Sequence, residues 1–160
     1  MPDRLLPRPL EVARVIDARP AIAFDYLRDL ENHWRIAGRF VQVMSLSGPP
    51  GARDGGLLRV HGPCGLRRTV RTRVTELDPP GSIVGMAEAG TRTRARVSWH
   101  LEPAGEGTRV TLRVAVDDAA RADRLLLGLG GRRWLHRRLR RVLRTLAQAP
   151  AGVPAAAQAS

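Results

Sequence analysis

Hydrophobic and polar residues alternate through much of the second half of the chain, as they do in half-buried β-strands. The clearest run covers residues 93–103, where Val97, Trp99 and Leu101 share one face. Similar runs, each separated from the next by turn residues, lie at 57–62, 67–78, 82–89 and 108–117. This spacing predicts an antiparallel meander whose arginine-rich face is exposed to solvent.

The first half of the chain predicts two strands with helices between them. Residues Leu10–Asp17 form a β-branched run, and Pro20 then suits the first position of a helix that continues to Leu30. Residues 31–40 predict a second, brief helix or turn, which Gly38 breaks. A further strand is expected at Phe40–Leu46, before a loop rich in glycine and proline.

A long amphipathic helix is predicted near the C-terminus, after Asp117 and Asp118. Its apolar stripe consists of Leu135, Leu139, Val142 and Leu146, and counting backwards places Gly128 and Gly131 on the same stripe. Two interpretations of these glycines stay open. They either remove side-chain volume to make room for a ligand, or they simply kink the helix or let it approach the sheet closely.

Three stretches resemble the SRPBCC superfamily, which contains START-like proteins, polyketide cyclases and lipid transport proteins. They are EVARVIDARPAIAFDYLRDLENHW, TRVTELDPPGSIV and VSWHLEPAGEGTRVTLRV, and the similarity covers Leu10–Leu146. Within them, the most recognisable motifs are Asp17–Pro20 at a helix start, Asp78–Pro80 at a turn and Glu102–Arg109 at a hairpin. The resemblance implies an α+β helix-grip fold, with a curved antiparallel sheet wrapped around the C-terminal helix and two short helices after the first strand.

The same resemblance implies an internal apolar cavity and a hydrophobic ligand, polyketide-like or lipid-like, with secondary metabolism as one setting. The face pattern names the residues expected to line that cavity. They are Val70, Thr72, Val74, Val97, Trp99, Leu101, Val110, Leu112, Gly128, Gly131, Trp134 and Leu135. Among them Trp99 and Trp134 could stack on a flat ligand, or could simply fill the core.

Length and composition fit one globular domain of 160 residues and 17.5 kDa. We expect an N-terminal arm at residues 1–9, the domain at 10–148 and a disordered tail at 149–160. No apolar stretch approaches the roughly 20 residues that span a bilayer. The first ten residues contain three prolines and three charges instead of the apolar core of an export signal, so a cytoplasmic location is expected.

The net charge of +12 comes entirely from arginine, because the chain contains no lysine. Residues 121–160 hold nine arginines and one acidic residue, a net charge of +8. Those predicted to face outward on the last helix are Arg133, Arg137, Arg140, Arg141 and Arg144. This face offers an alternative function, the binding of nucleic acid or an anionic membrane, although aromatic residues are rarely interleaved with the arginines.

Acid-base catalysis in the cavity, as in a polyketide cyclase, aromatase or dehydratase, is the second alternative. Glu76, Tyr26 and His61 are the candidate catalytic residues, and His33 is a further plausible one. Strand parity places Glu76 on the inward face with Val74, where burial would raise its pKa. The single cysteine, Cys64, cannot form an internal disulfide, and the four scattered histidines form no metal site, so we expect no cofactor.

Overall fold

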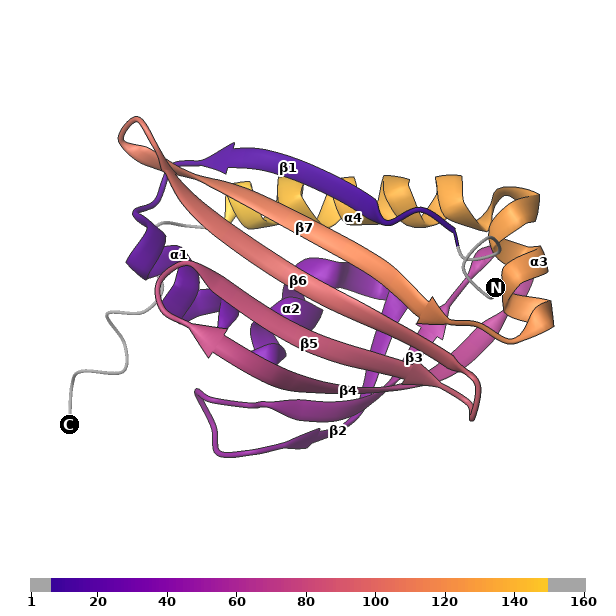
Figure 1. Ribbon diagram of the computed structural model, residues 1–160. Coiled ribbons are helices and arrows are strands. Elements are labelled where there is room, and N and C mark those ends of the chain that lie inside the picture. Colours follow the sequence, from indigo (N-terminus) through magenta and orange to yellow (C-terminus); the bar gives the residue numbers. More distant parts are fainter. Residues whose placement is uncertain (1–6, 150–160) are drawn as a thin grey trace.

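One curved antiparallel sheet of seven strands dominates the computed structural model, which describes residues 7–149. The strand order is β1-β7-β6-β5-β4-β3-β2 (Figure 1). The strands are β1 (Leu10–Ile16), β2 (Val41–Ser47), β3 (Gly55–His61), β4 (Arg67–Asp78), β5 (Ser82–Ala89), β6 (Thr93–Ala104) and β7 (Gly107–Asp118). The first six residues of the predicted arm and nearly all of the predicted tail lie outside the described residues.

The helices lie on the concave side of this sheet (Figure 1). They are α1 (Pro20–Leu27), α2 (Leu30–Ala37), α3 (Arg121–Leu126) and α4 (Arg132–Gln148). Three short helical segments join them to their neighbours: η1 (Gly38–Phe40), η2 (Pro63–Gly65) and the π-helical η3 (Leu127–Gly131). Two short helices after the first strand, a curved sheet and a C-terminal helix across it confirm the helix-grip fold.

The predicted meander is confirmed strand by strand. The strands β4 and β5 span the predicted residues, and β3, β6 and β7 differ from the prediction by at most two residues at either end. The β6–β7 hairpin turns at Gly105, whose φ of 61° lies in the left-handed region that glycine adopts without strain. Its register pairs Trp99 with Leu112 and Val97 with Val114, so the inward faces of the two strands are matched.

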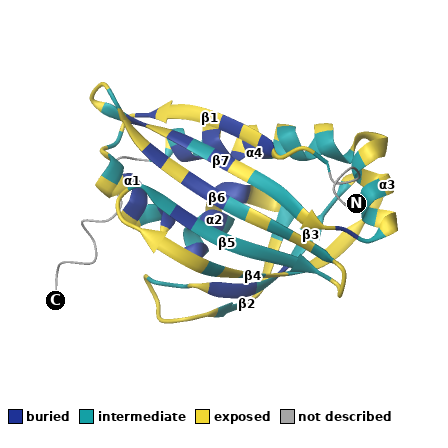
Figure 2. Ribbon diagram, viewed as in Figure 1, coloured by how far each residue is buried: buried dark blue, intermediate teal, exposed yellow. Residues whose placement is uncertain are grey.

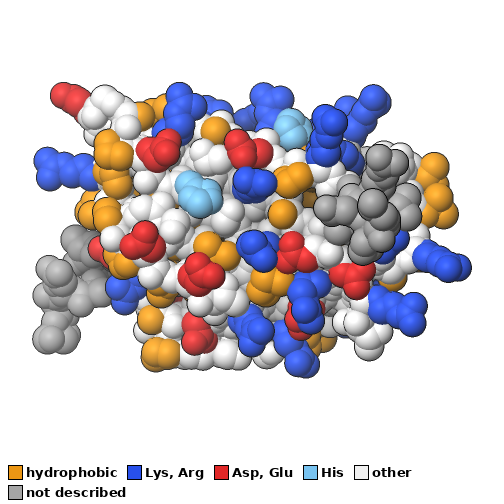
Figure 3. Space-filling model, in the orientation of Figure 1, with side chains coloured by type: hydrophobic (Ala, Val, Ile, Leu, Met, Phe, Trp, Pro, Cys, Tyr) orange, Lys and Arg blue, Asp and Glu red, His pale blue; other side chains and the backbone are white. Residues whose placement is uncertain are grey.

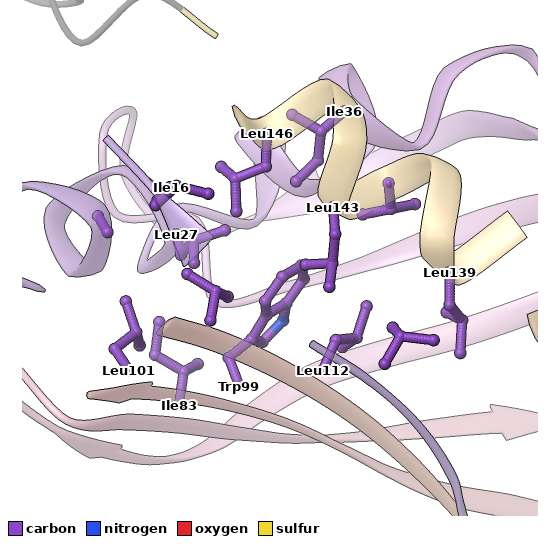
Figure 4. Packing of buried hydrophobic residues seen from close by; sticks show 14 of the residues in the cluster. Ile16, Leu27, Ile36, Ile83, Trp99, Leu101, Leu112, Leu139, Leu143 and Leu146 are labelled. Carbon is purple, nitrogen blue, oxygen red and sulfur yellow. The ribbon is translucent and has the colours of Figure 1, made fainter. Parts of the chain in front are cut away.

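The tightest packing lies at one end of the sheet, under helix α1 and the C-terminal half of α4. Leu27 and Val110 are 0% exposed and Leu143 is 2% exposed. Figure 2 shows buried residues along α4, β6 and β7 at this end. A close view shows Leu27, Leu101 and Leu146, which all belong to the buried cluster, between the helices and the sheet (Figure 4).

The C-terminal helix is interrupted, which corrects the predicted position of its two glycines. In η3, Leu129 leaves helical geometry and Gly130 has a φ of 108°. The interruption breaks the progression of about 100° per residue on which the stripe was counted. Gly128 is therefore exposed, and a Cβ added to Gly131 would lie 2.6 Å from the Leu126 carbonyl oxygen of its own helix. Of the two interpretations, the kinked helix is the one observed.

Charged side chains of both signs cover the outer face of the sheet (Figure 3). His100 is exposed there, on the same face as the arginines of β6. The five outward arginines of α4 are all exposed as well. None of the helices in residues 7–149 is long and apolar enough to cross a membrane, and the cytoplasmic location stays a prediction.

Candidate functional site

A cavity of about 250 Å³ lies between the sheet and the helices α2 and α4. The sheet contributes side chains from six strands: Val41, Leu58, Val60, Val70, Thr72, Val74, Ile83, Ala87, Ala95, Val97, Trp99, Leu112 and Val114. The helical segments contribute Leu30, His33, Trp34, Ala37, Phe40, Leu135, Leu139 and Val142. The wall is therefore almost entirely apolar, as in most small-molecule sites.

Small residues on β5 and β6 create this space. Inward positions at this end of the sheet hold Gly85, Ala87 and Ala95, whereas the filled end holds larger side chains such as Leu101. Gly85 also permits close packing of the strands, because a Cβ there would lie 2.9 Å from the Arg73 carbonyl oxygen. The cavity volume that was expected from the helix glycines thus comes from small residues of the sheet. The sequence signal for it was the alternating series Ile83, Gly85 and Ala87, in which the inward positions become small.

Trp99 divides the cavity from the filled end of the domain. Its neighbours on the inward face of β6 are Val97, which lines the cavity, and Leu101, which does not. Leu101 pairs with Val110, and both are buried in the packed core. The predicted lining residues Leu101 and Val110 are therefore inward, as expected, but they contact other side chains instead of the cavity.

Helix α2 brings two polar aromatic residues to the cavity and is fixed at both of its ends. Asp29 caps its N-terminus, accepting a hydrogen bond from the Glu31 backbone N–H at 3.0 Å. The same carboxylate accepts from the Arg53 backbone N–H at 3.3 Å, which ties the helix to the β2–β3 loop. At the other end Gly38 turns the chain with a φ of 74°. This anchoring holds His33 and Trp34 on the inner side.

His33 is the only titratable side chain directed into the cavity from the described helices. Its Nε2–H donates to the Leu27 carbonyl oxygen, which leaves Nδ1 as the acceptor of the neutral ring. Burial lowers the pKa of His33 to about 4, against opposing effects of the Leu27 hydrogen bond and the Asp29 carboxylate. The imidazole is thus uncharged at neutral pH.

Within residues 7–149, no ionised side chain projects into the cavity. Arg73 and its cross-strand partner Met86 border it, but they alternate with the inward residues Thr72 and Val74, so their side chains lie on the outer face. Because His33 is neutral, a bound molecule would meet only apolar groups, indole and hydroxyl donors and an uncharged imidazole.

A β-bulge overturns the inward orientation predicted for Glu76. The register of β4 against β5 shifts between Val74, which pairs with Gly85, and Glu76, which pairs with Val84. Because Thr75 is an extra residue in β4, each later residue of this strand faces the opposite side of the sheet from the one that simple alternation predicts. Glu76 is therefore exposed and lies outside the cavity wall.

The other two catalytic candidates also lie outside the cavity wall. Tyr26 belongs to α1 and packs against the core at the filled end. Burial raises the pKa of its hydroxyl above the ordinary value, and the smaller effect of nearby Arg35 opposes this rise. His61 ends β3, where it pairs with Arg67. Cys64 is exposed in η2. Within residues 7–149 no group of three histidine, cysteine or acidic residues is placed to bind a metal ion.

Trp134 packs outside the cavity. Its ring meets Phe40 edge-on, with 6.0 Å between the centroids. The Arg138 guanidinium lies 5.4 Å from the Phe40 centroid and 5.5 Å from that of Trp134. These cation–π contacts make Trp134 a boundary residue. Of the predicted lining residues, those that border the cavity are Val70, Thr72, Val74, Val97, Trp99, Leu112 and Leu135.

Comparison with known proteins bears on this architecture. The model of a family described as polyketide cyclase / dehydrase and lipid transport matches residues 9–149. No curated protein sequence matches the chain significantly. Among solved structures, TTHA0849 from Thermus thermophilus is 20% identical with a TM-score of 0.70, covering 88% of this chain and 94% of its own.

Two further structures share the fold at lower identity. Protein Ms6760 from Mycobacterium smegmatis is 14% identical with a TM-score of 0.66, covering 89% of this chain and 90% of its own. DynU16, a protein of the dynemicin biosynthetic locus, is 15% identical with a TM-score of 0.56. That match covers 89% of this chain and 46% of DynU16.

Proposed function

Because the chain belongs to the polyketide cyclase / dehydrase and lipid transport family, we propose that it binds a hydrophobic small molecule, polyketide-like or lipid-like, in the cavity. The observation that carries the proposal is the apolar cavity of about 250 Å³ between the sheet and α4. An apolar cavity of roughly 150 Å³ holds benzene in another protein, so this one has room for a two-ring molecule. Burial of the ligand's apolar surface would supply most of the binding free energy.

A cavity-filling substitution tests the proposal. Ala87 lines the cavity, and Ala87→Leu places three additional carbons in it. Ala13 is exposed on β1, so Ala13→Leu makes the same chemical change away from the cavity. Native mass spectrometry with a panel of linear and cyclised hydrophobic compounds should detect complexes of the wild type and of Ala13→Leu. We expect Ala87→Leu to weaken binding at least tenfold, and equal binding by both variants would refute the proposed location.

The family also contains enzymes, and a cyclase or dehydratase activity needs a proton acceptor near the ligand. His33 supports this alternative, because it is neutral and borders the cavity, whereas Glu76 does not. A bound product lighter by one water in the same mass spectra would favour the enzyme. In that case His33→Gln should abolish the mass loss while the substrate still binds, and Glu76→Gln should leave it intact.

A second candidate function is docking to an anionic membrane at the α3 end of the domain. Leu125 is 62% exposed and Leu129 is 75% exposed, and the arginines of α3 and α4 flank them in the chain. A nucleic acid would use only the arginines, which pair with its phosphates, and would leave the leucines exposed. An anionic membrane would use both, because its headgroups pair with arginines and its apolar interior takes up leucine side chains. Sedimentation with anionic vesicles, but not with neutral ones, is expected, and Leu125→Ser with Leu129→Ser should reduce it. Binding to duplex DNA without vesicle binding would refute membrane docking.

A further inference from the structure

Three residues that line the cavity carry buried polar atoms with no hydrogen-bond partner in residues 7–149. These atoms are the indole Nε1 of Trp34, the indole Nε1 of Trp99 and the hydroxyl Oγ1 of Thr72. The other two such atoms belong to the side chains of Arg53 and Arg124, which do not line the cavity. Folded proteins pair roughly nine-tenths of their buried polar groups, so three unpaired groups around one cavity need an explanation.

The two indoles flank a single imidazole. The His33 ring centroid lies 5.1 Å from that of Trp99 and 6.0 Å from that of Trp34. Trp99 is only 4% exposed, so bulk water does not reach its ring. Figure 4 shows the indole nitrogen of Trp99 on the side of Leu112, which lines the cavity, and away from Leu101, which belongs to the filled end. The unpaired N–H is thus turned toward the cavity end of the core.

The unpaired groups favour one kind of ligand. An indole nitrogen can only donate a hydrogen bond, so Trp34 and Trp99 require an acceptor. A carboxylate would be an acceptor too, but it would be buried without a cationic partner, because the Arg73 side chain faces outward and His33 is neutral. A pure hydrocarbon would leave all three groups unpaired.

We propose that the ligand is an uncharged molecule carrying at least one carbonyl or ether oxygen, which accepts hydrogen bonds from Trp99 and Trp34. Thr72, on the sheet wall, supplies a third donor. This inference rests on the proposed function and narrows it from any hydrophobic molecule to a neutral oxygen acceptor. By the same reasoning, a carboxylate placed against these donors should bind more weakly than an uncharged carbonyl or ether group.

Three probes of nearly equal size separate these ligand classes: 2-acetylnaphthalene, 2-ethylnaphthalene and 2-naphthoate. Their affinities for the wild type would be measured by titration calorimetry or ligand fluorescence. We expect the ketone to bind several-fold more tightly than the hydrocarbon, and the naphthoate to bind most weakly. Trp99→Phe and Trp34→Phe remove the N–H while keeping an aromatic ring, and each should weaken ketone binding about 3- to 10-fold.

The hydrocarbon and Trp134→Phe are the controls. The affinity of Trp99→Phe and Trp34→Phe for the hydrocarbon should differ from that of the wild type by less than about twofold, and this result would also show that the cavity is intact. Trp134→Phe should bind all three probes like the wild type, because Trp134 lies outside the cavity. If a tryptophan variant also loses affinity for the hydrocarbon, Thr72→Val provides the test instead. This substitution removes only the hydroxyl, so it should weaken binding of the ketone and leave binding of the hydrocarbon unchanged.

Each opposite result has a distinct meaning. Equal binding of ketone and hydrocarbon, tightest binding of naphthoate, or loss of ketone affinity only in Trp134→Phe would overturn the inference and leave the proposed function standing. Binding of no probe by the wild type would refute the proposed function itself.

Discussion

Acid should destabilise the domain through His33 in particular. The imidazole is buried between Trp34 and Trp99, and this burial lowers its pKa from 6.5 to about 4. In the unfolded chain the same imidazole is hydrated and regains its ordinary pKa near 6.5. Between these two pH values the unfolded state binds a proton that the folded state does not, so the free energy of unfolding falls as the pH falls.

The size of this effect follows from the two pKa values. Above pH 6.5 neither state is protonated at His33, and its contribution is fully present. Each pKa unit corresponds to about 1.4 kcal/mol, so acidification from pH 7.5 to pH 4.5 should remove about 2.5 kcal/mol through this one residue. That is a substantial part of the roughly 5–15 kcal/mol by which domains are usually stable.

The assay compares the wild type with His33→Gln by urea unfolding at several pH values, with circular dichroism as the measure of the folded fraction. Groups that titrate in both proteins cancel, so the gap between their unfolding free energies should narrow by about 2.5 kcal/mol from pH 7.5 to pH 4.5. His100→Gln, a change on the exposed outer face of β6, is the control and should keep the wild-type pH dependence. A gap that stays constant over this range would refute the burial of a neutral imidazole.

Other substitutions test individual parts of the structure. Gly128 has helical geometry and faces open space, so Gly128→Ala should increase the free energy of unfolding by up to about 1 kcal/mol and raise the thermal midpoint. Gly130→Ala should lower the thermal midpoint, because φ is 108° at that position. Thr108 is 0% exposed and its hydroxyl donates to the Ala18 carbonyl oxygen at 2.6 Å; Thr108→Val should cost about 1–3 kcal/mol in urea unfolding, and a smaller loss would contradict that hydrogen bond. Glu76→Gln should leave the affinity for every hydrophobic ligand unchanged, and a loss of binding would show that the bulge at Thr75 is misplaced.

The orientation of single residues on regular strands could be predicted from the sequence. A strand of alternating residues has only two faces, so Val97, Trp99 and Leu101 had to share one of them, and burial of the apolar face made that face inward. The apolar stripe of α4 followed in the same way from helical periodicity, and Leu139, Val142 and Leu146 are buried as predicted.

Irregular backbone was decided by the tertiary structure. One extra residue at Thr75 exposes Glu76, and the π-helical η3 turns Gly128 out of the predicted stripe. The bulge at Thr75 has no strong local signal, and the glycines of η3 allowed a kink only as one of two interpretations, so counting by a fixed period fails beyond both interruptions.

The sequence by itself determined the order of helices and strands, the inward face of the sheet and the apolar character of the interior, because these depend on patterns within each element. The helix-grip arrangement of the elements was implied by the resemblance to the SRPBCC superfamily. Only the tertiary structure decided which inward residues border the cavity. Leu101 and Val97 lie on the same face of β6, yet α1 and the end of α4 fill the space beside Leu101 while small residues leave it open beside Val97. The site of His33 likewise depends on how α2 is held against Trp99, a contact between segments that are distant in the chain. A cavity is the space that several elements leave between them, and no single element encodes it.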